Sequence, residues 1–356
     1  TGSKTYNYYE GICFRDITCT VSGSGATDGT AYGGAIRGGT ITLSNNGSVT
    51  FSGNTASGAG SASGGGAIDV SLGFPLKINN NGETIFRGNY AHSTASRADG
   101  GAIEKQYGIF SIQNNASVVF EKNYALGKET LRLQSIYAFD LEDAGNEMLV
   151  NFSAPKGGKI EFRDSIDIVV DRNSASAFHL NNWYVNDAGE KVAQTGDIIF
   201  TGEDATAENL KAILAEHGIH RVATADEIRL SKTSEVGGTM QLHDGRLIVR
   251  DGAIIWADGI TVHSSASGES TPTLWLDNGE LTSYADSSTR KNAVTISGGS
   301  ALRLSGQNTA GNSTLTLSTG STFIIDVTRL DIAFICQCIM RIGRNHIAVK
   351  NTKSFY

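Results

Sequence analysis

The chain has 356 residues, of which 18% are charged, with 43 Gly, 3 Pro and a formal net charge of −7. Disordered chains combine few apolar residues with high charge, so this composition indicates a sizeable folded protein rich in β-structure. The acidic balance and the scattered Lys and Arg exclude the basic surface of a nucleic-acid binder, and no window reaches the roughly 20 apolar residues of a membrane helix.

Residues 1–30 precede the repeated pattern and are interpreted as an N-terminal cap or the remnant of a leader. The chain opens at Thr1 without an initiator Met or an apolar signal segment, which indicates a processed or excised piece. Cys13 and Cys19 are close enough to bridge around a small loop, with two inert buried thiols as the alternative. Cys336 and Cys338 form a C-x-C pair without easy disulfide geometry, and the four cysteines lack the spacing of a zinc site.

Residues 31–170 contain copies of one unit. Each copy begins with Gly-Gly-Ala-Ile, at residues 33, 65 and 100, and ends with Phe-x-x-Asn, at residues 51, 86 and 120. This period is typical of solenoids. The first copy contains Gly33, Gly34, Ala35, Ile36, Phe51 and Asn54, the second Gly65, Gly66, Ala67, Ile68, Phe86 and Asn89, and the third Gly100, Gly101, Ala102, Ile103, Phe120 and Asn123.

Each copy is predicted to form short strands joined by tight turns. Apolar and polar residues alternate, as in Thr40 to Leu43, while Asn-rich turns precede each Phe and supply residues with positive φ. Strands this short need stacked neighbours, so the fold predicted is an all-β parallel β-helix. The paired glycines suit a sharp bend or a close approach to the next copy, and each Phe points inward. Each Asn bonds backbone, stacks on another Asn, or offers hydrogen bonds outward.

The tetrapeptides carry a resemblance. Their alternation, above all Phe51 to Ala56 and Phe86 to Ala91, resembles the chlamydial polymorphic membrane proteins and the wider set of bacterial autotransporters that share this repeat. A fourth copy is predicted at Gly157 to Ile160 with Phe162 to Ser165, where Ser165 takes the place of the Asn. The resemblance implies a right-handed β-helix passenger of type V secretion, carried out by an outer-membrane β-barrel translocator and displayed at the bacterial surface as an adhesin and virulence factor.

Residues 171–326 are predicted to continue the β-helix without the tetrapeptides, with a helical insertion near 206–218. Leu210, Ile213, Leu214 and His217 share one face of this helix, Thr206 is its N-cap, and Gly218 follows its end. The helix is expected to pack on the outside of the β-helix.

Residues 327–356 are an atypical tail. No β-barrel is expected in it, because Leu330 to Met340 is apolar and free of Gly and the rest is basic without turn signals. The tail is interpreted as a foreign reading frame or an artificial end, and a segment that covers the open end of the solenoid is the alternative.

The predicted function is adhesion without catalysis. No catalytic residue, cofactor or metal ligand is assigned, and the partner expected is a host-cell surface receptor or glycan, contacted through loops 57–63, 92–98 and 183–189. Two alternatives stay open, a structural surface filament and a polysaccharide lyase or glycoside hydrolase. The enzyme alternative rests on Asp164, Asp167 and Asp171, since related folds place acidic residues on one strand face.

Overall fold

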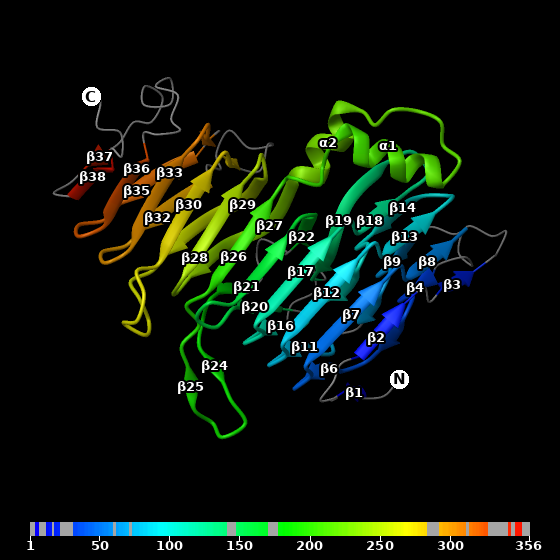
Figure 1. Ribbon diagram of the computed structural model, residues 1–356, viewed down its shortest axis with the longest axis horizontal. Coiled ribbons are helices and arrows are strands. Elements are labelled where there is room, and N and C mark those ends of the chain that lie inside the picture. Colours follow the sequence, from blue (N-terminus) through cyan, green and yellow to red (C-terminus); the bar gives the residue numbers. More distant parts are fainter. Residues whose placement is uncertain are drawn as a thin grey trace, which may run out of the picture.

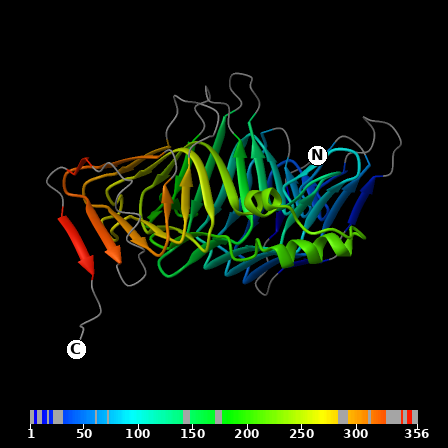
Figure 2. The same ribbon diagram turned by 90° about the horizontal axis from the view of Figure 1, so that it is seen from above.

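The computed structural model is an elongated stack of mostly parallel strands with two helices on one side (Figures 1 and 2). Residues 4–6, 12–15, 18–21, 31–59, 62–70, 73–140, 147–169, 177–282, 292–310, 313–326, 341–342 and 346–350 are described. No helix in this part of the chain is long and apolar enough to cross a membrane. Each repeat adds one strand to each row of strands, and we call the strands of one repeat a layer.

One sheet has eleven strands, each paired in parallel with the next. Its strands, in spatial order, are β2 (Ile12–Arg15), β7 (Ser48–Ser52), β12 (Glu83–Arg87), β17 (Ser117–Glu121), β21 (Lys159–Phe162), β26 (Asp197–Thr201), β28 (Arg246–Arg250), β30 (Thr273–Asp277), β33 (Ala301–Ser305), β36 (Thr322–Asp326) and β38 (His346–Lys350).

The larger sheet has 22 strands in three rows. The row after the paired glycines contains β5 (Ile36–Gly38), β10 (Ile68–Val70), β15 (Ile103–Gln106), β19 (Leu131–Phe139), β22 (Ser165–Val169), β27 (Thr233–Leu242), β29 (Ile254–Val262), β31 (Glu280–Thr282) and β34 (Thr309–Ala310). The next row contains β1 (Lys4–Tyr6), β6 (Ile41–Ser44), β11 (Leu76–Asn79), β16 (Gly108–Gln113), β20 (Met148–Ser153), β23 (Ala177–Leu180), the second halves of β27 and β29, β32 (Asn292–Ile296), β35 (Ser313–Leu317) and β37 (Arg341–Ile342). The last row contains β3 (Thr18–Val21), β8 (Thr55–Gly58), β13 (Tyr90–Ser93) and β18 (Tyr124–Leu126).

Two small sheets flank the stack. The first is formed by β4 (Ala31–Tyr32), β9 (Ala62–Gly64) and β14 (Arg97–Asp99), and the second is the antiparallel hairpin of β24 (Tyr184–Val185) and β25 (Lys191–Val192). The pair of β18 and β19 is also antiparallel, and all other described pairs are parallel.

The core forms as the repeats predict. Phe51, Phe86 and Phe120 are fully buried, and their rings stack face to face with centroids 4.9 and 4.7 Å apart. Alternation places every second strand residue inside, so side chains from both large sheets form one continuous apolar core. The predicted β-rich fold with large parallel sheets is confirmed at this level.

The helical insertion contains two helices where the sequence predicted one. Helix α1 (Ala207–Glu216) begins at the predicted cap, since the Thr206 side chain accepts a hydrogen bond from Asn209 N. Leu210 and Leu214 are buried against strands β18 and β19, which confirms packing on the outside of the stack. Helix α2 (Ala225–Lys232) was not predicted, because the residues it buries, Glu227 and Ser231, are polar.

Two further predictions need correction. Ile160 pairs with Val118 of β17, which comes directly after an Asn-rich turn. Gly157 and Gly158 therefore occupy the position of that turn in the next layer and do not form a fourth Gly-Gly-Ala-Ile corner. Cys13 is an exposed free thiol, since it lies in register with Thr50 on one sheet while Cys19 lies in register with Ala56 on the other. In the tail, β37 and β38 continue the parallel pairing of the stack; residues 327–340, with Cys336 and Cys338, lie outside the described residues.

Candidate functional site

The asparagines of the repeat form a buried ladder along the stack. Oδ1 of Asn89 accepts hydrogen bonds from the backbone N of Asn54 at 3.0 Å and from its Nδ2 at 2.8 Å. Oδ1 of Asn123 accepts the same pair from Asn89, at 3.1 and 2.9 Å. Because all three side chains are fully buried, they do not offer hydrogen bonds outward, and the prediction of an outward role for them is wrong.

A second ladder runs through the Asn-rich turns. Asn46, Asn81 and Asn115 bond to one another in the same way, with Nδ2 to Oδ1 distances of 2.8 and 2.9 Å. The residue before each of them has positive φ, 59° at Asn45, 57° at Asn80 and 54° at Asn114, as expected for Asn in tight turns.

The two glycines of each corner have different roles. The first has positive φ, 66° at Gly33, 62° at Gly65 and 58° at Gly100, which an L side chain rarely adopts. The second makes the close approach: a Cβ added to Gly66 would lie 2.0 Å from the carbonyl oxygen of Gly101 in the next layer. Of the repeat residues only Ala35 is partly exposed, so these motifs shape the stack and do not form a contact surface.

The Asn54 ladder ends on a carboxyl group. Oδ2 of Asp164 accepts hydrogen bonds from Asn123 N at 2.9 Å, Asn123 Nδ2 at 3.0 Å and Ser135 Oγ at 2.8 Å. Asp164 therefore takes the Asn place that was predicted for Ser165, because this turn is one residue shorter than its predecessors. Burial raises the pKa of Asp164 to about 7.

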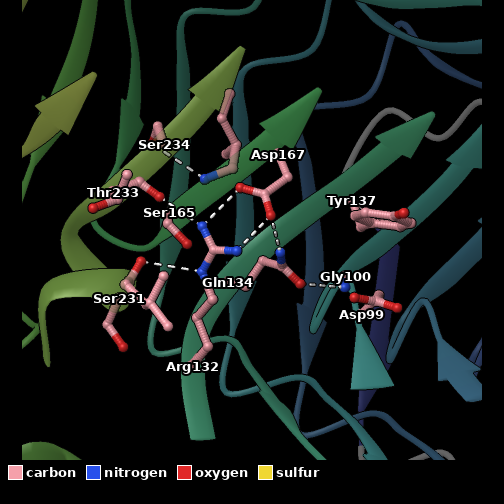
Figure 3. A network of polar contacts seen from close by, with 12 residues as sticks. Asp99, Gly100, Arg132, Gln134, Tyr137, Ser165, Asp167, Ser231, Thr233 and Ser234 are labelled. Atoms are coloured by element: carbon pink, nitrogen blue, oxygen red, sulfur yellow. Dashed lines mark hydrogen bonds and ion pairs between the residues drawn. The ribbon is translucent and has the colours of Figure 1, made fainter. Parts of the chain in front are cut away.

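Next to this end lies the polar network of Figure 3. The Arg132 guanidinium forms an ion pair with both oxygens of Asp167, at 2.5 and 2.7 Å, and donates to the carbonyl oxygens of Leu230 and Thr233. Gln134 donates to Asp167 Oδ2 at 2.8 Å and accepts from Gly100 N at 2.8 Å. The network thus joins the end of helix α2 to the last regular repeat.

Asp167 also belongs to a column of polar residues, most of them charged. Arg37, Asp69, Glu104, Tyr137, Asp167 and Glu235 occupy equivalent positions on successive strands. Burial raises the pKa of Asp69 to about 6 and, with help from the charges of Asp69 and Asp99, that of Glu104 to about 8. Glu104 is buried and packs so closely under Gly64 that a Cβ there would lie 1.3 Å from its Oε2.

Two acidic residues of the enzyme alternative are held inside the stack. Asp164 and Asp167 are buried, and their hydrogen bonds and ion pair are internal to the stack. Asp171 lies outside the described residues. A pocket elsewhere is lined by Gly157, Gly158, Lys159, Thr195, Gly196, Asp197, Gly245, Arg246, Ser270 and Thr271. Asp197 in this lining accepts hydrogen bonds from Arg246 through both of its carboxylate oxygens.

Two of the three predicted loops, 92–98 and 183–189, contain exposed residues. The hairpin of β24 and β25 projects away from the stack, on the side opposite the helices (Figure 1). Val185, the last residue of β24, is 55% exposed, and the preceding Trp183 and Tyr184 are partly exposed. In loop 92–98, Thr94 to Arg97 are exposed; of loop 57–63, residues 60 and 61 lie outside the described residues.

Helix α1 is held by an aromatic cluster. Nε2 of His217 lies 3.0 Å from the Tyr124 hydroxyl oxygen, and the His217 ring meets the edge of the Tyr90 ring. His92, whose Nδ1 is 3.3 Å from Ser57 Oγ, lies beside His217 with ring centroids 5.4 Å apart. Burial lowers the pKa of both histidines. The charge of His217 lowers the pKa of His92 further, whereas the charge of Glu216 raises the pKa of His217 and offsets part of the effect of burial.

Comparison of the chain with protein-family models, curated proteins and solved structures gave no match. The resemblance drawn from the repeat tetrapeptides therefore stays a prediction.

Proposed function

We propose that the chain is a right-handed parallel β-helix, a surface-displayed autotransporter passenger that acts as an adhesin at the bacterial outer membrane or after secretion. The partners proposed are a host-cell surface receptor or glycan and, for secretion, an outer-membrane β-barrel translocator. A structural surface filament is the competing proposal.

The observation that carries the adhesin proposal is the contrast between the repeat motifs and the projecting hairpin. The motif side chains are buried, where they stack on one another or form the Asn ladders between layers, and this supports a rigid rod. The hairpin, in contrast, presents Trp183, Tyr184 and Val185 outside the layers. Aromatic residues are enriched at interfaces because they bury a large area and keep a polar end. A filament needs no such projection.

The test measures cell binding of beads coated with the purified chain. We expect the beads to bind epithelial cells, and the double variant Trp183→Ser, Val185→Ser to bind less. The matched control is Val222→Ser, because Val222 is a similar residue with 67% exposure at the helical insertion. Wild-type beads that bind no better than albumin-coated beads on several cell types would overturn the adhesin proposal and favour the filament.

A hairpin variant that binds as well as the wild type would leave adhesion standing and move the contact to another segment. Replacement of Thr94 to Ser96 by a Gly-Ser segment of equal length is the second variant for that outcome, since these three residues are exposed.

A further inference from the structure

Three histidines form a column on the outer side of the larger sheet. His179 lies in β23, His243 follows β27, and His263 follows β29. Backbone hydrogen bonds between neighbouring strands fix the positions of these residues along the stack. His243 N donates to Leu180 O at 3.0 Å, and His263 N donates to Leu242 O at 2.9 Å. Their separation of 64 and 20 residues gives no local sequence motif, so the sequence did not predict a site here.

The side chains in this column face one another. Nδ1 of His179 and Nε2 of His243 are 2.9 Å apart, and the rings of His243 and His263 stack with centroids 4.8 Å apart and an interplanar angle of 4°. Nε2 of His263 is buried and has no hydrogen-bond partner among the described residues. Nitrogens of two imidazoles therefore meet at one point, and a third lies in the same column.

Two imidazole nitrogens at this distance are close to the separation of two ligands on one metal ion. With Zn–N bonds of about 2.0–2.1 Å and tetrahedral angles, two ligand nitrogens lie about 3.3 Å apart. A metal ion would take the place of the hydrogen-bonding proton, which moves to the other nitrogen of its ring, once the two nitrogens separate by about 0.4 Å and the rings tilt so that both lone pairs point at the ion. No three His, Cys, Asp or Glu side chains of the described residues are arranged around one metal position. The protein would therefore supply two ligands, His179 and His243, which already face each other.

We propose that His179 and His243 bind one first-row transition-metal dication, such as Zn²⁺, through their facing nitrogens, with water in the remaining positions. Imidazole suits Zn²⁺, Cu²⁺ and Ni²⁺, whereas Mg²⁺ and Ca²⁺ prefer oxygen ligands.

The surroundings of the column fit this assignment. A metal ion binds imidazole in its neutral form. Asp244, the next residue, adds a negative charge that favours a cation; its carboxylate accepts hydrogen bonds from Ser265, Ser270 and Ser267.

The test is isothermal titration of the full chain, free of any polyhistidine tag, with ZnCl₂. We expect saturable binding, a loss of affinity of at least about tenfold in His179→Gln and in His243→Gln, and no response to MgCl₂. The matched control is His92→Gln, because His92 is also a half-buried histidine with a lowered pKa but belongs to the cluster under helix α1.

A second measurement needs no variant. Diethyl pyrocarbonate modifies accessible histidines, and mass spectrometry reports each site. Zn²⁺ is expected to protect His179 and His243 and to leave His92 and His220 unchanged. The proposal is overturned if the wild type does not bind Zn²⁺, if His243→Gln binds as tightly as the wild type, or if Zn²⁺ protects all four histidines equally.

Discussion

Oδ1 of Asn89 accepts two hydrogen bonds from Asn54 in the layer below, at 3.0 and 2.8 Å, while its Nδ2 donates to Phe51 O at 3.0 Å. One amide side chain therefore satisfies backbone groups of the layer below and, through Asn123, joins the layer above. A ladder of this kind replaces water as the partner of the corner backbone, which is why the side chain can be fully buried.

The first prediction is that Asn89→Ala lowers the free energy of unfolding by about 2–4 kcal/mol, because it leaves several buried polar groups of Asn54 and Phe51 without partners. The measurement is the midpoint of urea unfolding. Asn151→Ala, a partly exposed Asn on the outer face of β20, is the control and should stay within about 0.5 kcal/mol of the wild type. Equal effects at the two positions would contradict the ladder.

The regular repeats could be predicted from sequence because identical residues at fixed spacing must occupy identical positions in a stack. Phe51, Phe86 and Phe120 show this directly. The network at the end of the repeats could not, since Arg132 bonds to Thr233, 101 residues away, and no repeated spacing links them. Helix α2 escaped prediction because it packs through Glu227, which accepts from Leu131 N, and through Ser231, which accepts from Leu133 N. Apolar periodicity does not detect such a face.

The second prediction separates the two uses of glycine at the corners. Gly66→Ala should cost about 3 kcal/mol or more, because the new Cβ would lie 2.0 Å from Gly101 O and 2.6 Å from backbone atoms of Tyr90. Gly88→Ala is the matched control, since Gly88 has a φ of 60° but no atom within 4 Å of the added Cβ, and should cost only about 1–2 kcal/mol. Thermal unfolding of the two variants measures the difference. A larger loss at Gly88 would show that backbone strain, and not contact between layers, dominates the corner.

The third prediction concerns a lysine inside the core. Lys105 lies in register with Val70 and Ala138, is fully buried, and donates to the carbonyl oxygens of Gln106 and Tyr107. Burial lowers its pKa from 10.5 to about 7. Between these values the unfolded chain binds more protons than the folded chain, so this group makes the protein less stable as the pH falls from 10.5 towards 7.

Lys105→Met should therefore be more stable than the wild type at pH 7, by at least about 1 kcal/mol, with an advantage that shrinks towards pH 10. Urea midpoints at several pH values measure the difference between variant and wild type. Lys77→Met is the control for the loss of a lysine, because Lys77 is partly exposed on a neighbouring strand, and should change the urea midpoint at pH 7 less than Lys105→Met does. A variant that is less stable than the wild type at every pH would show that the hydrogen bonds of Lys105 outweigh the cost of burying its charge.

The last prediction is that acid loosens helix α1. His217 and His92 have pKa values lowered by burial, so below about pH 6.5 the unfolded or undocked state binds more protons and docking weakens as the pH falls. Two charged rings with centroids 5.4 Å apart would also repel each other, and Glu216 offsets this only in part. Hydrogen exchange of residues 207–216, corrected for the intrinsic rate, should therefore be faster at pH 5 than at pH 7.5. His217→Gln retains a donor and an acceptor for the Tyr124 hydroxyl and should reduce this pH dependence, while His220→Gln, at an exposed position, should not. Exchange that responds to pH equally in His217→Gln and the wild type would show that other groups control the docking of the helix.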